Sequence, residues 1–184
     1  MGKKAVFLDR DGVVNVEKDY AHKIEDFEFL SGVFEAVRAF NRGGYIVVVV
    51  TNQSGIGRGY YTSADFEKLT EYMLDRFKEE GCEIAGVYHC PHTPDSDCEC
   101  RKPNPGMLLA AQKELDIDLP ASWMIGDKES DIEAALAAGV QKTVLVRSGH
   151  KIDEKNTKAT FVVNGIFDTI RIVTDFAHNI KIVN

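Results

Sequence analysis

The chain contains 184 residues, of which 44% are apolar and 28% are charged. This composition is typical of globular proteins and excludes a disordered, collagen-like or coiled-coil chain, and the length predicts one domain over residues 1–184. With 22 basic and 29 acidic residues the net charge is −7, which argues against partners such as nucleic acid or an anionic membrane surface.

The beginning of the chain predicts a cytoplasmic protein. A short apolar stretch follows Lys3 and Lys4 and ends at Asp9, which is too short for a signal peptide or a membrane span. We therefore expect a cytoplasmic protein without membrane contacts, with a monomer as the default state.

In chain order, short apolar runs alternate with stretches of helical periodicity. The runs are rich in β-branched residues and end at polar ones, as is typical of strands buried on both faces; they cover residues 5–8, 45–50, 84–89, 123–125, 143–146 and 161–163. Helical spacing predicts helices near residues 33–40, 66–77, 107–115, 129–138 and 167–177. The alternation indicates a doubly wound α/β fold, in which helices cover both faces of a parallel sheet.

Three of the predicted helix ends carry capping signals. Ser31 is the expected N-cap of the first helix. Thr62 and Asp65 have the spacing of a capping box before the second helix. Gly139 follows the fourth helix and is expected to end it.

Acidic residues follow two of the predicted strands, where ligands bind in open parallel sheets. Asp9 and Asp11 are two residues apart, so in an extended segment they face one side while Arg10 faces away. Asp127 and Asp131 follow another strand at the start of a helix. Each acid alone could be a turn residue or a helix cap, but together their oxygens predict a Mg²⁺ site.

Residues 90–103 lack apolar periodicity and are expected to form a zinc-binding loop. Three thiolates and one imidazole match a tetrahedral structural zinc site; the candidate ligands are Cys90, His92, Cys98 and Cys100. A disulfide from Cys90 to Cys98 or Cys100 and ligation by His89 remain alternatives, and Cys82 is expected to be a free thiol. Zinc here would fix the approach of the adjacent Lys102.

Four motifs occur in the order typical of one superfamily: Asp9-x-Asp11-Gly12-Val13, Thr51-Asn52, Lys102 before Pro103, and Gly126-Asp127-x-x-x-Asp131. By these motifs the chain resembles the haloacid dehalogenase-like phosphatases, whose core is a Rossmannoid sheet. Over residues 4–150 it is most similar to the heptose bisphosphate phosphatases of that superfamily. The segments after the first and third strands are too short for the separate cap domain that many relatives carry, so we expect an open site.

The resemblance implies a phosphatase that works through an aspartyl-phosphate. Asp9 would be the nucleophile, and Asp11 would act first as general acid and then as general base. Thr51 and Lys102 would donate hydrogen bonds to the phosphoryl oxygens, and Asp131 would orient Lys102 or a metal-bound water.

The resemblance also implies a metal and a substrate. Mg²⁺ would be held by Asp9, the main-chain carbonyl of Asp11, and Asp127. The substrate would be a small sugar bisphosphate, a heptose 1,7-bisphosphate that loses its C7 phosphate in the synthesis of nucleotide-activated heptose for lipopolysaccharide or a surface glycan. The substrate contacts implied by similarity are Glu17, Lys18, Asp19, Tyr20, Asn52, Gln53, Ser54, Arg101 and Lys128.

Three alternative functions fit the sequence less well. Histidinol-phosphate phosphatases share the zinc loop and the aspartates, but residues 54–59 and 104–107 resemble the heptose enzymes more closely. A nucleotide-binding oxidoreductase is disfavoured because Tyr60 stands where the glycine-rich fingerprint needs glycine. A non-enzymatic zinc adaptor would explain the cysteines but leave Asp9, Asp11 and Asp127 unexplained.

Overall fold

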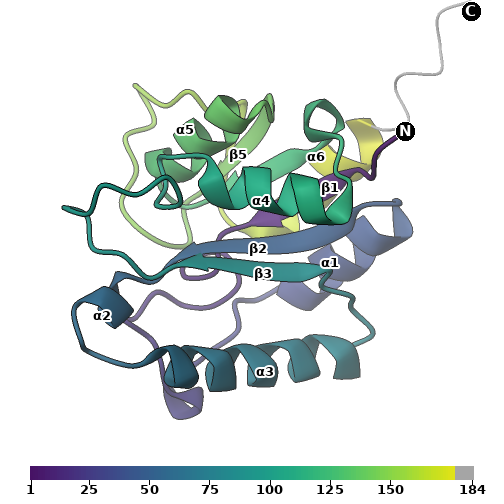
Figure 1. The fold of residues 1–184 in the computed structure, drawn as a ribbon. Helices are drawn as coiled ribbons and strands as arrows, with labels where there is room; N and C mark the ends of the chain where they lie inside the picture. Colours follow the sequence, from purple (N-terminus) through teal and green to yellow (C-terminus); the bar gives the residue numbers. More distant parts are fainter. Residues whose placement is uncertain (177–184) are drawn as a thin grey trace, which may run out of the picture.

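A parallel sheet of six strands organises the computed structural model, which describes residues 1–176 (Figure 1). The strand order is β3-β2-β1-β4-β5-β6, and every neighbouring pair is parallel. All six predicted strands are confirmed, with ends that differ by at most two residues. Their bounds are β1 Ala5–Leu8, β2 Ile46–Asn52, β3 Gly86–Cys90, β4 Trp123–Gly126, β5 Lys142–Val146 and β6 Phe161–Val163.

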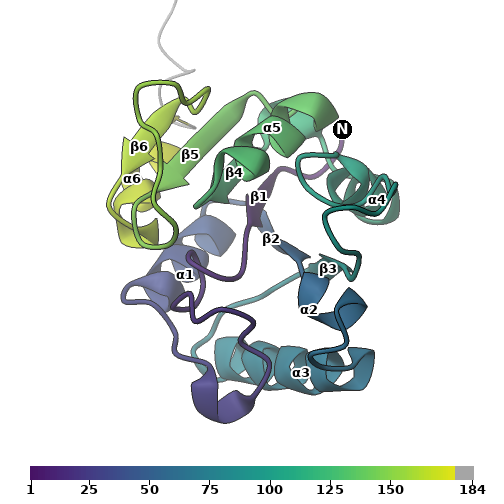
Figure 2. The same cartoon turned by 90° about the vertical axis from the view of Figure 1, so that its left-hand side faces the viewer.

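Helices cover both faces of the sheet, as the alternating pattern predicts. The helices are α1 Val33–Arg42, α2 Ser54–Gly57, α3 Ser63–Glu79, α4 Gly106–Leu115, α5 Glu129–Ala138 and α6 Thr169–Phe176, with short 3₁₀ turns η1 Ile24–Asp26, η2 Leu119–Ala121 and η3 Ile166–Asp168. Figure 2 shows α1, α3 and α6 on one face and α4 and α5 on the other. Each face has its own cluster of buried apolar side chains, which is why the central strands contain continuous apolar runs.

Two capping predictions are confirmed and one is wrong. Thr62 and Asp65 form the capping box of α3, and Gly139 ends α5 in the left-handed region at φ 106°. The N-cap of α1 is Gly32 rather than Ser31, because the chain enters the helix through φ 83° at Gly32, which favours glycine. The last predicted helix is divided into η3 and α6, and its expected end at Ala177 lies outside the described residues.

The strand order places the functional edge of the sheet between β1 and β4. From β1 the chain moves outward to β2 and β3, then returns to β4 on the other side of β1. Such a reversal leaves a crevice beyond the carboxyl ends of the two central strands. These carboxyl ends face the viewer in Figure 2. Leu8 pairs with Ile125, so Asp9 and Asp127 follow neighbouring strand ends. Loops, the short helix α2 and the start of α5 border this edge in the described part of the chain, without a separate domain.

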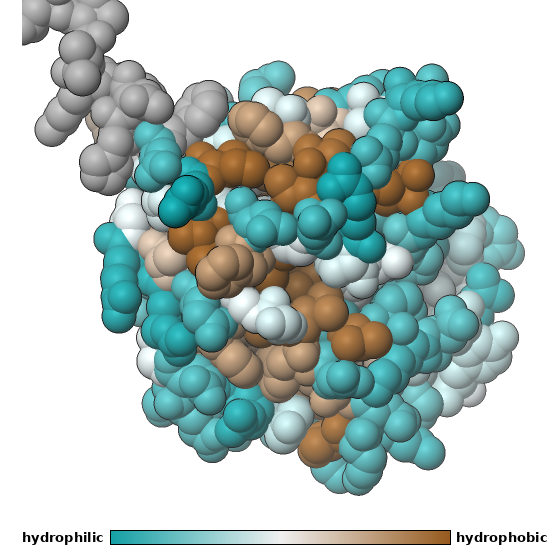
Figure 3. All heavy atoms as spheres, turned by 180° about the vertical axis from the view of Figure 1, so that it is seen from behind, coloured by the Kyte–Doolittle hydropathy of each residue, from teal (hydrophilic) through white to brown (hydrophobic). Residues whose placement is uncertain are grey.

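An apolar surface remains on the side of η3 and α6. The side chain of Phe167 is 57% exposed, and with Ile170 it lines a shallow groove. Apolar side chains also reach the surface in the view from behind (Figure 3). Among the described residues, no helix has the length and apolar character needed to cross a bilayer.

Candidate active site and metal centres

A buried lysine lies between two carboxylates beyond the ends of β1 and β4. Lys102 Nζ is 2.9 Å from Asp9 Oδ1 and 2.7 Å from Asp131 Oδ1, and it also donates to the carbonyl oxygen of Val50. The second oxygen of Asp131 accepts hydrogen bonds from the main-chain N–H groups of residues 127 and 128. Asp131 therefore holds Lys102 against Asp9, in agreement with the orienting role expected for it.

The site has more negative charge than its lysine can balance. Burial and the neighbouring Asp131 raise the pKa of Asp9 well above its ordinary value, although Lys102 opposes the shift. Burial disfavours the charge of Lys102, but Asp131 and Asp9 outweigh burial and raise its pKa. Burial and Asp131 also raise the pKa of Asp127 to about 6. A cation bound beside Asp9 and Asp127 would relieve this repulsion.

The surroundings of Asp127 fit a metal ligand. Its Oδ2 accepts hydrogen bonds from the main-chain N–H of His150 at 3.0 Å and from the ring Nδ1 at 2.6 Å, whereas its buried Oδ1 has no hydrogen-bond partner. A Cβ added at Gly12 or Gly149 would lie within 2.4 Å of Asp127 Oδ2, so only glycine fits at these two positions. Carboxylate oxygens of Asp9, Asp127 and Asp131 lie within 4.8 Å of one another, and hard oxygen ligands of this kind suit Mg²⁺.

Asp11 lies beside this cluster and is held by several donors. Its carboxylate accepts hydrogen bonds from the guanidinium of Arg10, from Asn15 Nδ2 and from Gln53 Nε2, at 3.0 to 3.2 Å. As expected, Arg10 does not line the reaction centre, but its guanidinium reaches the carboxylate of Asp11. Arg10 is buried between the rings of Phe27 and Phe66, and a buried guanidinium needs a charged or polar partner, which Asp11 provides.

Residues at the end of β2 support the site from the side of β1 that lies opposite β4. Thr51 is buried, and its Oγ1 accepts a hydrogen bond from Gln53 Nε2 at 2.8 Å. The side-chain amide of Asn52 makes two bonds to the main chain of Lys102, accepting from its N–H and donating to its carbonyl oxygen, each at 3.1 Å. Asn52 therefore links β2 to the segment that carries the lysine.

The four expected zinc ligands lie together in the loop that precedes Lys102. Their ligand atoms are within 4.8 Å of one another, and His92 Nδ1 is 3.4 Å from Cys90 Sγ and 3.3 Å from Cys100 Sγ. No disulfide joins them, because all four cysteines of the chain are free thiols. Three sulfurs and one nitrogen in this arrangement suit tetrahedral zinc.

The alternatives for this loop do not fit the structure. The ring of His89 stacks on Phe66 with centroids 4.1 Å apart and belongs to no ligand cluster, so His92 is the histidine of the site. Cys82 lies outside this loop and is a free thiol, as expected. It is buried, and its thiol donates to the carbonyl oxygen of Phe34. Burial and Cys100 raise the pKa of Cys90 to about 12, so zinc binding must displace a proton from this thiol.

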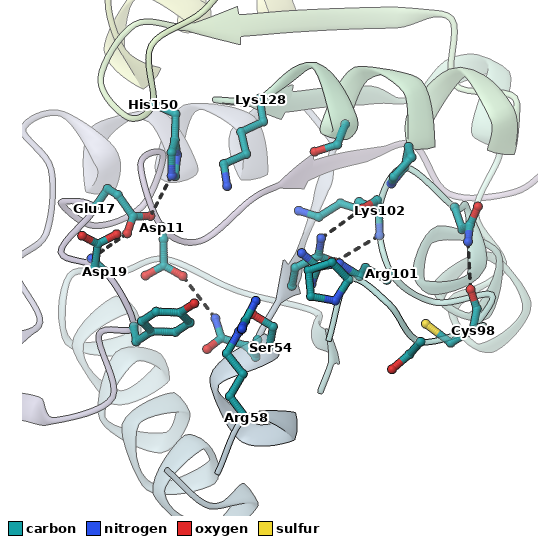
Figure 4. A pocket seen from close by; sticks show the side chains of 18 of the residues that line it. Asp11, Glu17, Asp19, Ser54, Arg58, Cys98, Arg101, Lys102, Lys128 and His150 are labelled. Atoms are coloured by element: carbon teal, nitrogen blue, oxygen red, sulfur yellow. Dashed lines mark hydrogen bonds and ion pairs between the residues drawn. The ribbon is translucent and has the colours of Figure 1, made fainter. Parts of the chain in front are cut away.

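An open cleft of about 580 Å³ leads to the carboxylates (Figure 4). A deeper recess of about 70 Å³ is lined by Asp9, Asp11 and Lys102. Most of the expected substrate-binding residues line the cleft or the recess: Glu17, Asp19, Tyr20, Asn52, Gln53, Ser54, Arg101 and Lys128. Lys18 does not line either, because its ammonium pairs with Glu28 at 3.1 Å. Thr51 and Asp127 are buried behind the cleft walls.

Arg58 and His150 are two charged or titratable cleft residues that the sequence prediction of the site does not include. Arg58 lines the cleft from the end of α2, and His150 lines it from the loop after β5. The sequence signal for His150 is its position after the fifth strand, where it follows Ser148 and Gly149. Arg58 lies within a glycine-rich segment whose motif alone does not show which side chain turns inward.

The parallel sheet and the carboxylate–lysine site are those of a haloacid dehalogenase-like (HAD-like) hydrolase. A HAD-hydrolase-like family model matches residues 99–171. In the solved structures, the D,D-heptose 1,7-bisphosphate phosphatase from B. bronchiseptica, complexed with magnesium and phosphate, superimposes with a TM-score of 0.84 at 30% identity, covering 94% of this chain and 99% of that one.

Sequence relatives narrow the class further. A D-glycero-beta-D-manno-heptose-1,7-bisphosphate 7-phosphatase of Yersinia pestis is 48% identical over 89% of this chain and 92% of its own length. The protein of the same name from Vibrio cholerae is 46% identical over 98% of this chain and its own full length. The chain belongs to this family of heptose bisphosphate phosphatases within the HAD-like hydrolases.

Proposed function

We propose that the protein removes the C7 phosphate of D-glycero-D-manno-heptose 1,7-bisphosphate, in the synthesis of nucleotide-activated heptose for lipopolysaccharide or a surface glycan. The observation that carries this proposal is the buried contact between Asp9 and Lys102 at the base of an open cleft. The names of the relatives supply the substrate. The relatives act on the beta anomer, and we extend that preference to this protein.

Asp9 is the proposed nucleophile. Its carboxylate oxygen forms a bond to phosphorus while the bond from phosphorus to the C7 oxygen breaks, and Asp11 donates its proton to that leaving oxygen. Lys102 and Thr51 donate to the non-bridging phosphoryl oxygens, which carry the charge of the transition state. In the second step Asp11, now a carboxylate, takes a proton from the water that hydrolyses the aspartyl-phosphate.

The donor sets suit two metals with different roles. Mg²⁺ bound to Asp9, Asp127 and the main-chain carbonyl of Asp11 would supply positive charge between the nucleophile and the phosphoryl group. Cys90, His92, Cys98 and Cys100 would hold zinc with no open coordination position, so the zinc site is structural. Because the loop continues directly to Lys102, ordering it also positions the catalytic lysine.

The polar cleft suits a phosphorylated sugar. Arg58, Arg101 and Lys128 line the cleft and supply positive charge for the second phosphate of a bisphosphate. Glu17, Asp19 and Ser54 add acceptors and donors for sugar hydroxyls. We further propose that residues 1–184 work as one phosphatase domain, monomeric and in the cytoplasm.

The test is Mg²⁺-dependent phosphate release by the purified protein from both anomers of the bisphosphate and from histidinol phosphate. Asp9→Asn is the matched blank, because it removes the nucleophile while keeping the side-chain shape. We expect a large preference for the beta bisphosphate. A preference for histidinol phosphate would overturn the substrate, and no Mg²⁺-dependent release from any of them would overturn the enzymatic function.

A further inference from the structure

The side chain of Gln53 lies between two of the proposed catalytic groups. It is only 3% exposed, and its Nε2 is 3.1 Å from Asp11 Oδ2 and 2.8 Å from Thr51 Oγ1. An amide nitrogen carries two hydrogens, so it can donate to both acceptors. We propose that Gln53 is a positioning residue that fixes Asp11 and Thr51 relative to each other, and that it does not bind substrate. This inference rests on the proposed roles of Asp11 and Thr51.

The orientation of the Gln53 amide follows from its partners. When Asp11 is a carboxylate it only accepts, so the amide nitrogen faces it in that state. On the other side the amide Oε1 is 2.5 Å from the hydroxyl of Tyr61. Burial raises the pKa of Tyr61 to about 12, so this hydroxyl keeps its proton and donates it to Oε1. Both ends of the amide are thus satisfied within the protein.

Tyr61 is itself held in place by two contacts. Its ring stacks on His22, with centroids 4.9 Å apart and planes 4° from parallel. It also packs over Gly55, where a Cβ would lie 2.1 Å from Tyr61 Cε1. The absence of a side chain at Gly55 therefore leaves the space for the ring. Gly55, two residues after Gln53, is therefore a glycine because a larger residue there would displace the Tyr61 ring.

This arrangement has a consequence for each catalytic group. Because Thr51 Oγ1 accepts from Gln53, its own hydroxyl hydrogen remains for a phosphoryl oxygen. Asp11 becomes a carboxylate when its proton moves to the leaving oxygen, and the Gln53 amide then donates to the charge that develops. A misplaced acid or donor loses much of its effect, because these contributions depend on geometry.

The test compares two kinds of leaving group. An alkyl oxygen needs a proton from Asp11 as it departs, whereas p-nitrophenolate departs readily without one. Gln53→Met keeps the length of the side chain and removes its hydrogen bonds. We expect kcat/KM to fall about 10- to 100-fold for heptose 1,7-bisphosphate and mannose 6-phosphate, and much less for p-nitrophenyl phosphate. The ratio kcat/KM excludes hydrolysis of the aspartyl-phosphate, since it reports only the steps up to loss of the leaving group.

Three further variants complete the test. Tyr61→Phe removes only the hydroxyl and should shift the alkyl-to-aryl ratio in the same direction by a smaller factor; it carries the test if Gln53→Met does not fold. Gln141→Met, at an exposed position before β5, should leave both rates unchanged. In an Asp11→Asn background, Gln53→Met should change the ratio little, because the acid is already absent.

Equal losses for alkyl and aryl phosphates would overturn the positioning of Asp11 by Gln53, as would an undiminished effect in the Asp11→Asn background. The proposed substrate is tested separately. If the wild type hydrolyses mannose 6-phosphate and p-nitrophenyl phosphate but not the heptose bisphosphate, the proposed function fails. The ratio between those two compounds then still decides the role of Gln53.

Discussion

Replacing Asp127 by asparagine is expected to stabilise the magnesium-free protein while abolishing its activity. Asp127 is fully buried, and burial together with Asp131 raises its pKa from 3.8 to about 6. Above pH 6 the folded protein must therefore carry a buried carboxylate whose charge is disfavoured, whereas the unfolded chain ionises the same group in water near its ordinary pKa.

The pH dependence follows from the direction of this shift. Between the unfolded pKa and about 6, the folded protein binds more protons than the unfolded chain, so the free energy of unfolding falls as pH rises. A shift of about two units corresponds to about 3 kcal/mol. Asp127→Asn removes this cost, so the variant should unfold with a free energy higher by up to about 3 kcal/mol at pH 8 and by little at pH 4.

Urea unfolding of the variant and the wild type in magnesium-free buffer measures this difference at both pH values. Any loss of zinc at pH 4 affects the two proteins alike. Asp131→Asn is the matched control with the opposite expected sign, because Asp131 pairs with Lys102 and its second oxygen accepts two main-chain N–H groups. Added Mg²⁺ should stabilise the wild type and not Asp127→Asn. An Asp127→Asn protein less stable than the wild type at pH 8 would refute the reasoning.

Three other substitutions test separate parts of the site. Cys98→Ser should lose zinc, measured by elemental analysis, and lower kcat while circular dichroism shows the sheet retained; normal turnover without metal would contradict the structural role of the loop. Asn52→Ala should lower kcat about 10-fold, because the main chain of Lys102 loses two hydrogen bonds, and a change in KM alone would argue for substrate contact instead. Arg101→Ala should raise KM about 10-fold for the bisphosphate and less for mannose 6-phosphate; equal increases would place Arg101 away from the second phosphate.

Much of the fold is local information and could be predicted from the sequence. The central strands β1, β2, β4 and β5 are almost entirely buried, so their apolar runs identify them directly. The edge strands β3 and β6 are only partly buried, but they too are apolar enough to be predicted. The cysteine spacing predicts a metal loop because its four ligands are close along the chain. The acids at the ends of β1 and β4 meet because a parallel sheet brings its carboxyl ends to one edge.

The directions and partners of the loop side chains were decided only by the tertiary structure. Asn52 and Lys102 are separated by 50 positions, and Gln53 and Asp11 by 42, so no local pattern reveals that these amides support catalytic groups. Arg10 faces Asp11 because burial between aromatic rings leaves its charge no water, and Lys18 turns to Glu28 instead of the cleft. Periodicity determines which face of an element is buried, but a polar side chain in a loop points to whichever partner the folded chain brings within hydrogen-bonding distance.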